Sequence, residues 1–85
     1  MPQVKVYTTA YCAYCTRAKQ LLSRKGVTYQ EVDLSNDDAL REQISGETGW
    51  RTVPQIFIGD EFIGGFDELK ALDDAGRLDA MLANG

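Results

Sequence analysis

The sequence predicts a single α/β domain over residues 1–85, in which a small mixed four-stranded sheet is flanked by helices. Three observations lead to this prediction. A chain of 85 residues is long enough for one compact core and too short for two. The expected element order is β-α-β-α-β-β-α, and its strand–helix–strand start implies a right-handed crossover between two parallel strands. Two apolar runs around a Gly-Asp turn at positions 59–60 indicate an antiparallel hairpin.

The first strand and the first helix follow from the spacing of the apolar residues. Val4, Val6 and Thr8 alternate with other residues, which is typical of a strand. Residues 13–25 are expected to be helical, because apolar side chains recur there at the three- and four-residue spacing of one helix face. The members of that face are Ala18, Leu21 and Leu22.

The next two elements repeat this alternation of strand and helix. Residues 27–34 alternate again and predict a second strand. The run Ser35-Asn36-Asp37-Asp38 has the Ser-x-x-Asp form of a helix start. We therefore expect a short helix over residues 37–46, ended by the glycines at 46 and 49.

The last third of the chain predicts a hairpin and a final helical region. The hairpin strands are expected at residues 55–58 and 61–63, and the glycine pair at 64–65 breaks the second of them. The helical region that follows can be interrupted at Gly76. Its apolar residues are Leu69, Leu72, Leu78, Met81 and Leu82.

Composition and charge exclude several classes of protein. The net charge of −4 lacks the basic excess of a nucleic-acid binder, although residues 1–30 alone carry five basic and no acidic side chains. Without histidine, a His-bearing zinc finger and any Ser-His or Cys-His catalytic arrangement are excluded. No apolar run approaches the length of a membrane span, and the N-terminus does not resemble a signal peptide. We therefore expect a cytoplasmic protein with no nucleic-acid or membrane partner.

The chemistry is expected at the Cys-Ala-Tyr-Cys run of positions 12–15, where the first strand gives way to the first helix. Two cysteines at this spacing can form a small-ring disulfide. Cys12 would lie at the helix N-terminus, where unpaired N–H groups and the helix dipole favour a thiolate. A thiolate of this kind is both a nucleophile towards disulfides and a good leaving group. Cys15, one turn further along, would be less exposed and suited to resolving a mixed disulfide.

A lone Cys-x-x-Cys run fits a redox pair, half of a metal site, or a coincidence. The chain has no further cysteine and no histidine to complete a zinc site. The run also lies inside a β-α-β pattern, which is the context of thioredoxin-like redox motifs. These two observations favour redox chemistry over structural thiols or metal binding shared between chains.

Three groups of residues resemble the glutaredoxin family, and in particular its small bacterial dithiol members. They are Tyr7-Thr8 with the cysteine run and Arg17-Ala18-Lys19, then Thr52-Val53-Pro54-Gln55, then Gly64-Gly65-Phe66-Asp67. They occur in the family's order and spacing and span essentially the whole chain. The resemblance implies a thioredoxin-like fold and a glutathione-dependent enzyme that reduces protein disulfides and protein–glutathione mixed disulfides. Glutathione would be the co-substrate, and the enzyme is expected to act as a monomer.

The resemblance also implies roles for individual residues. Cys12 matches the nucleophile that becomes glutathionylated, and Cys15 matches the resolving thiol. The residues that match the family's glutathione site are Tyr14, Thr52, Val53, Pro54, Gly65, Phe66 and Asp67. Pro54 would follow a cis peptide bond, and the backbone of its loop would pair with the cysteinyl unit of glutathione.

Two of the residues near this site have a second, structural interpretation. Asp67 either accepts a hydrogen bond from the glutamyl ammonium of glutathione or caps the last helix, or does both. Arg51 precedes the loop and either reaches a glutathione carboxylate or is merely solvated. We interpret Trp50 as loop packing.

The chain departs from the family pattern at three positions. Ala13 replaces the usual proline, Thr9 stands where a lysine is common, and Phe66 stands where many relatives have another cysteine. Because relatives with a small residue at the first of these positions sometimes bind a [2Fe–2S] cluster, one alternative is a dimer holding a cluster with Cys12 and glutathione from each side. Another is a general electron donor served by thioredoxin reductase.

Overall fold

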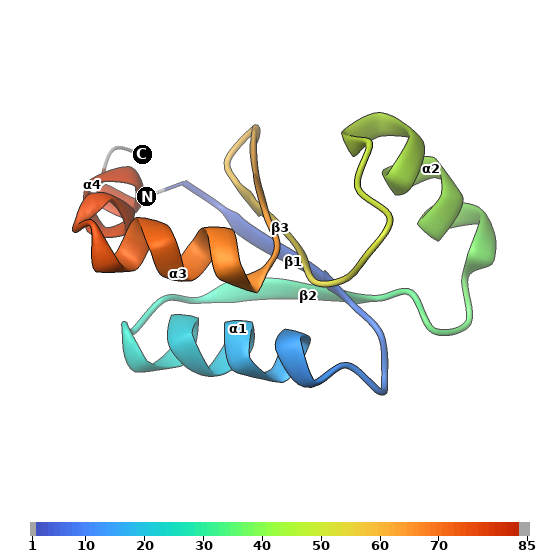
Figure 1. Ribbon diagram of the computed structural model, residues 1–85, viewed down its shortest axis with the longest axis horizontal. Helices are drawn as coiled ribbons and strands as arrows, with labels where there is room; N and C mark the ends of the chain where they lie inside the picture. The colour runs from blue at the N-terminus through green and yellow to red at the C-terminus, as the bar shows by residue number, and fades with distance from the viewer. Residues whose placement is uncertain (1, 84–85) are drawn as a thin grey trace.

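The structure is a computed structural model that describes residues 2–83, and it has the α/β architecture that the sequence predicts (Figure 1). The described residues contain four strands and four helices. In chain order they are β1 (Val4–Thr8), α1 (Ala13–Arg24), β2 (Tyr29–Asp33), α2 (Asp38–Thr48), β3 (Gln55–Ile58), β4 (Glu61–Gly64), α3 (Phe66–Asp74) and α4 (Arg77–Ala83).

The four strands form one mixed sheet in the order β2-β1-β3-β4. β1 and β2 pair in parallel, as the crossover through α1 requires, and β3 pairs antiparallel with both β1 and β4. The predicted parallel pair and the predicted hairpin are both confirmed. No helix in residues 2–83 is long and apolar enough to cross a membrane.

One face of the sheet carries the larger core, beneath α1, α3 and α4. Alternate side chains of β1 and β3 point to this face, as the twofold period of a strand dictates. The helices contribute aliphatic side chains, including the whole stripe predicted for the first helix. The buried members are Val4, Val6, Ala18, Leu21, Leu22, Ile56, Ile58, Leu69, Leu78 and Leu82.

The opposite face is covered by α2, which stands apart from the other helices in Figure 1. Its buried cluster consists of Tyr7, Leu34 and Ile44. Aromatic rings extend this cluster across the sheet, because Tyr7 contacts Phe57 and Phe57 contacts Phe62, with ring centroids 5.8 and 5.1 Å apart. The core on this face is therefore smaller and more aromatic than the core beneath α1.

The helix boundaries correct two expectations. Asp37, and not Ser35, caps α2, because its carboxylate accepts a hydrogen bond from the Leu40 N–H at 3.0 Å. The helix also continues through Gly46 and ends at Gly49, whose φ of 73° is the left-handed conformation that terminates helices. Gly76 has the same φ and separates α3 from α4, which confirms the interruption considered there.

Candidate active site

Cys12 occupies the N-cap position of α1, at the end of a short loop that leaves the carboxyl end of β1. Its sulfur accepts a hydrogen bond from the Cys15 N–H at 3.1 Å. Its thiol lies 3.5 Å from the Val53 carbonyl oxygen, to which it donates. Negative charge on this sulfur is stabilised by the N–H donor and by the positive end of the helix. The predicted position of Cys12 at a helix start is confirmed.

Cys15 lies in the first turn of the same helix and differs sharply from Cys12. Its side chain is 1% exposed, and both cysteines are free thiols. Burial, with a smaller contribution from the hydrogen bond with Cys12, raises the pKa of the Cys15 thiol to about 12. The predicted difference in exposure between the two thiols is therefore confirmed.

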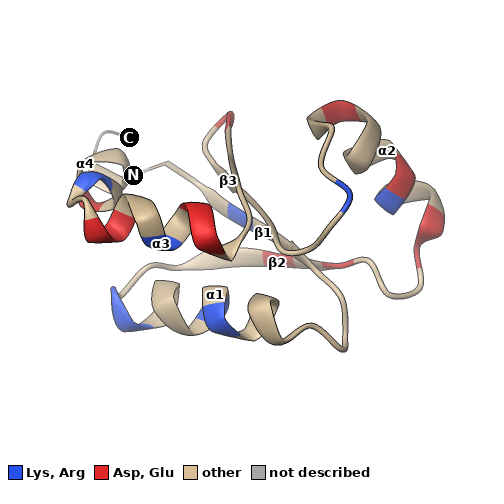
Figure 2. Ribbon diagram, in the orientation of Figure 1, with Lys and Arg blue, Asp and Glu red and all other residues tan. Residues whose placement is uncertain are grey.

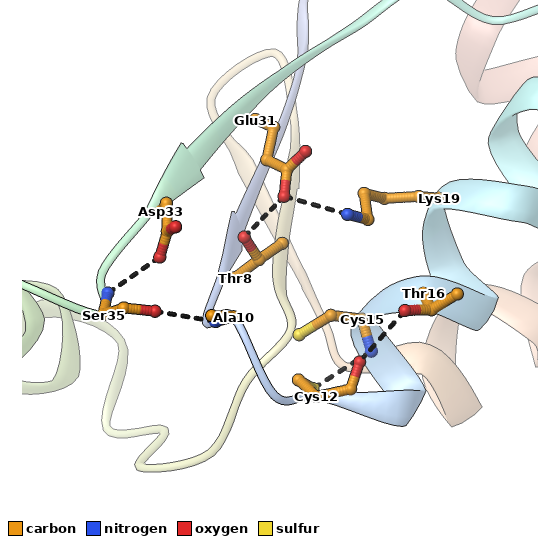
Figure 3. Close-up of polar contacts among 9 residues, drawn as sticks. All are labelled: Thr8, Ala10, Cys12, Cys15, Thr16, Lys19, Glu31, Asp33 and Ser35. Carbon is orange, nitrogen blue, oxygen red and sulfur yellow. Dashed lines mark hydrogen bonds and ion pairs between the residues drawn. The ribbon is translucent and has the colours of Figure 1, made fainter.

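The loop that carries Cys12 is held by the segment that follows β2 (Figure 3). The Ala10 N–H donates to the Ser35 hydroxyl at 2.7 Å, and the Ser35 N–H donates to the Asp33 carboxylate at 2.8 Å. The Ser35 side chain is thus engaged with the thiol loop, and this explains why it does not cap α2. Sequence reasoning missed this role, because Ala10 and Ser35 are brought together only by the parallel pairing of β1 and β2.

A groove of about 370 Å³ lies beside the thiols, and it brings together seven of the eight residues expected to bind glutathione. They are Tyr14, Thr52, Val53, Pro54, Gly65, Phe66 and Asp67. They come from three places in the chain, namely the first turn of α1, the loop before β3 and the start of α3. The Val53–Pro54 peptide bond is cis, as the resemblance implied. Arg51 is exposed in the same loop but does not line the groove.

Two further residues line the groove. Trp50 packs edge-on against Phe62, with ring centroids 5.8 Å apart, so the packing role predicted for it is confirmed, but it also forms part of the groove wall. Glu68 accepts a hydrogen bond from the Gly65 N–H at 2.9 Å and thereby caps α3. The N-cap of α3 is Gly65, so the expectation that Asp67 caps this helix is wrong. Only the Glu half of a capping box is present, because Gly65 has no side chain to accept from the N3 N–H.

The buried side chain of Gln55 holds the loop of residues 49–54 in place. Gln55 is 2% exposed, and its Nε2 donates to the Trp50 carbonyl oxygen at 2.7 Å. The Thr48 hydroxyl donates to Gln55 Oε1 at 3.0 Å and accepts from the Trp50 N–H at 3.1 Å. This small network pairs Gln55 and Thr48 with the Trp50 backbone where the loop leaves α2 and enters β3, although the buried Trp50 Nε1 has no partner. It helps to place the Val53 carbonyl near Cys12.

The surroundings of Cys12 combine exposed aromatic rings with positive charge. Tyr11 is fully exposed and Tyr14 is 54% exposed. The Arg17 guanidinium lies 5.3 Å from the centre of the Tyr14 ring, within the range of a cation–π contact. Figure 2 shows that α1 carries Lys and Arg but no acid, whereas acids predominate on α2. The site can therefore attract an anionic thiol or disulfide compound.

A metal site has less support than thiol chemistry. Within residues 2–83, no group of three or more Cys, Asp or Glu side chains is arranged to hold a metal ion. What the described arrangement can do is exchange disulfides, because it offers one accessible sulfur with stabilised charge and a second, buried thiol one turn away.

Comparisons with known proteins agree with this chemistry. The family model for glutaredoxin matches residues 4–63. A glutaredoxin of Pseudomonas aeruginosa is 53% identical over 83 residues, which cover 98% of this chain and 99% of the relative. Glutaredoxin 3 of Escherichia coli is 50% identical over 82 residues, which cover 96% of this chain and 99% of that protein.

Solved structures show the same fold. The crystal structure of a buckwheat glutaredoxin–glutathione complex superposes with a TM-score of 0.92 at 36% identity, covering 96% of this chain and 77% of that one. The solution structure of a glutaredoxin from Brucella melitensis superposes with a TM-score of 0.87 at 48% identity, covering 96% and 89% of the two chains. The thioredoxin-like fold implied by the resemblance is confirmed.

Proposed function

The chain belongs to the glutaredoxin family of thiol–disulfide oxidoreductases, and on that premise we propose that its reaction depends on glutathione. The observation that carries the proposal is the groove beside the thiols. Val53 lines this groove, and its carbonyl oxygen accepts a hydrogen bond from the Cys12 thiol at an Sγ–O distance of 3.5 Å. A tripeptide lying in the groove would thus have its sulfur next to Cys12. The structural neighbour from buckwheat, described as a complex with glutathione, supports this assignment.

The proposed reaction on a glutathionylated protein needs one cysteine. The Cys12 thiolate attacks the glutathione sulfur of the mixed disulfide, and the bond between that sulfur and the protein sulfur breaks. The protein leaves as a thiolate and takes up a proton. A second glutathione, as thiolate, then attacks the glutathione sulfur bound to Cys12, which regenerates the Cys12 thiolate and releases oxidised glutathione.

Reduction of a protein disulfide uses both thiols. Cys12 attacks one sulfur of the substrate and remains linked to it. Cys15 then attacks Cys12, so that the Cys12–Cys15 disulfide forms and the substrate leaves fully reduced. The burial of Cys15 suits it to this second step, because a buried thiol does not compete with Cys12 for the incoming substrate.

The groove residues are assigned to the parts of glutathione by their chemistry. The exposed backbone of residues 52–53 can pair with the cysteinyl unit, and the Asp67 carboxylate can accept from the glutamyl ammonium. Tyr14 offers a ring face beside the sulfur, and Gly65 and Phe66 form the groove floor near α3. Arg51 lies outside the groove lining, so an interaction with a glutathione carboxylate would require its side chain to swing inward.

The central test compares two serine variants with a glutathionylated peptide as substrate and reduced glutathione as the only reductant. Cys12→Ser is expected to abolish turnover, because no other exposed thiol exists in the sequence. Cys15→Ser is expected to retain a rate within about twofold of the wild type, since the one-cysteine route does not use it. Loss of turnover in Cys15→Ser at saturating glutathione would contradict the one-cysteine route.

A groove variant tests the glutathione site separately from the thiols. Asp67→Asn is expected to raise the KM for the glutathionylated peptide by about tenfold, because a hydrogen bond to a charged group contributes roughly 1.5–3 kcal/mol. Asp38→Asn, an exposed acid on α2, is the matched control and should leave KM unchanged. Equal effects of the two variants would argue against the groove as the glutathione site.

The protein partners proposed for this activity are glutathionylated and disulfide-containing proteins, met by a monomer in the cytoplasm. The alternative of a [2Fe–2S] cluster shared between two copies stays a prediction that no observation on the described residues favours. Reduction by thioredoxin reductase also stays a prediction. The groove favours glutathione as the reductant instead, because seven of the residues expected to bind glutathione line it.

A further inference from the structure

Behind the buried thiol lies an ion pair that the proposed one-cysteine reaction does not use. The Lys19 ammonium is 3.0 Å from Glu31 Oε2, and the same oxygen accepts a hydrogen bond from the buried Thr8 hydroxyl at 2.8 Å. The three side chains come from α1, β2 and β1 and meet on the α1 face of the sheet (Figure 3). Lys19 is therefore tethered at its charged end and is not a freely solvated surface lysine.

The tether places a positive charge beside Cys15. Lys19 follows Cys15 by four residues on α1, so the two side chains lie on the same helix face. Figure 3 shows both of them directed from α1 towards β1 and β2. The other cations of α1 do not serve this position, since Arg17 lies over the Tyr14 ring and Arg24 is exposed in the last turn.

Lys19 is one of the groups that shift the pKa of the Cys15 thiol. Burial, followed by the neighbouring Cys12, raises the pKa of the Cys15 thiol, while the Thr9 backbone and, to a smaller extent, Lys19 oppose that rise. The hydrogen bond from Thr8 and the pairing with Lys19 lower the pKa of Glu31, and Glu31 in turn raises the pKa of Lys19. Both members of the pair are therefore charged at neutral pH, and Lys19 is the one cation among the groups that shift the pKa of Cys15.

We propose that Lys19, held in place by Glu31 and Thr8, is a positioning residue for the two-thiol reaction, in which its ammonium stabilises the charge that develops on Cys15 during attack on Cys12. The inference deepens the proposed function, because it concerns only the step in which a mixed disulfide on Cys12 is resolved. It has no part in the transfer of glutathione to Cys12.

The step balances in bonds, electrons and protons. Cys15 Sγ forms a bond to Cys12 Sγ, and the bond between Cys12 Sγ and the substrate sulfur breaks. The substrate sulfur leaves as a thiolate and ends with the proton that Cys15 has lost. The cysteine pair is oxidised by two electrons, and the substrate disulfide is reduced by the same two electrons. Negative charge develops on the buried Cys15 sulfur at the start of this step. The Lys19 ammonium, on the same face of α1, stabilises that charge most while it is on Cys15.

The test compares two substrates on the reduced protein. A peptide with an internal disulfide requires both thiols, whereas a glutathionylated peptide with glutathione as reductant requires Cys12 alone. Lys19→Met keeps the length of the side chain and removes its charge. It is expected to slow the two-thiol reaction by about tenfold and to change the one-cysteine reaction by less than about twofold.

Three controls separate this role from a structural one. Arg24→Met removes the same charge from the same helix and should leave both reactions unchanged. Lys19→Arg should restore most of the lost two-thiol rate. The equilibrium between the dithiol and the Cys12–Cys15 disulfide in a glutathione redox buffer should be the same in Lys19→Met and the wild type, because Cys15 carries no charge in either form.

The outcomes also separate this inference from the function on which it rests. Wild-type protein that cannot reduce the glutathionylated peptide would overturn the proposed function itself. Wild-type protein that reduces both peptides, combined with a Lys19→Met variant of unchanged two-thiol rate, would overturn only the role of Lys19. Equal slowing of both reactions by Lys19→Met would also overturn it, since that result would mean a general disturbance of α1.

Discussion

The two faces of the sheet hold the two halves of the active site in different ways. The helix with both cysteines, α1, buries an aliphatic stripe in the ten-residue core that it shares with α3 and α4. The loop of residues 49–54, proposed to bind glutathione, follows α2, which buries only Ile44 and packs on a three-residue cluster. The nucleophile thus rests on a large apolar core, whereas the loop that faces it depends on a small core and a few polar contacts.

The difference shows how a chain of this length divides its limited buried surface. In the proposed reaction, the sulfur of Cys12 must keep its place at a helix N-terminus, and a helix is held most firmly by burying one whole face. The loop of residues 49–54 must offer its backbone groups to a ligand, so it cannot be covered by a second large core. On the α2 face, the hydrogen bonds of Gln55 hold the loop in addition to the small apolar core.

The comparison is tested most strongly by the same substitution on both faces. Leu22→Ala in the larger core is expected to lower the free energy of unfolding by about 4 kcal/mol, and Leu34→Ala in the smaller cluster by about 2.5 kcal/mol. Both side chains are essentially buried, but Leu34 has partly exposed neighbours that can relax around the cavity. Urea unfolding measures the two values, and equal losses would show that the two cores resist a cavity alike.

Replacing a buried polar side chain tests how much the hydrogen bonds on the α2 face contribute. Gln55→Leu keeps the approximate volume and removes two hydrogen bonds, because the Trp50 carbonyl loses its Gln55 donor and the Thr48 hydroxyl loses its Gln55 acceptor. This is expected to cost about 2 kcal/mol. The KM for a glutathionylated peptide should rise as well, because the loop beside Cys12 loses its clamp. Gln43→Leu on the exposed side of α2 is the control for the added apolar side chain. An unchanged KM in a destabilised Gln55→Leu protein would mean that the loop is positioned by other contacts.

The smallest expected effect concerns the pH dependence of stability on the α1 face. The Thr8 hydroxyl and the Lys19 ammonium lower the pKa of Glu31 below its usual 4.5, so the folded state favours the carboxylate. Its contribution to stability is therefore complete above that pH and is lost as the pH falls through the lowered pKa. Between about pH 5 and 3, wild-type protein should lose more stability than Glu31→Gln. The effect is modest, because the Glu31 side chain is 38% exposed.

Urea midpoints measured across this pH range for both proteins provide the measurement. Glu42→Gln, an exposed acid on α2, should follow the wild-type curve. A Glu31→Gln curve that runs parallel to the wild type would show that the interactions with Thr8 and Lys19 do not stabilise the folded state.

Expectations based on periodicity were confirmed, and several based on helix ends were not. The strand β1, the stripe of α1 and the hairpin follow from residues close together in sequence, whose spacing decides which side chains share a face. The Ser-x-x-Asp run at 35–38 does precede α2, but Asp37 caps the helix. Asp67, for which a cap was one of two interpretations, lies inside α3. A short polar side chain bonds to whichever partner the fold brings near, and for Ser35 that partner is Ala10, 25 residues away.

The sequence by itself determined the α/β class, the order of the strands and helices, and the placement of Cys12 at a helix start, because each depends on local spacing. The family resemblance added the groove residues, and seven of the eight do line one groove. Only the tertiary structure decided that Trp50 and Glu68 join them, that Arg51 does not, and that Lys19 pairs with Glu31. These contacts join residues from separate elements, whose distances are set by strand pairing and helix packing rather than by their separation in the chain.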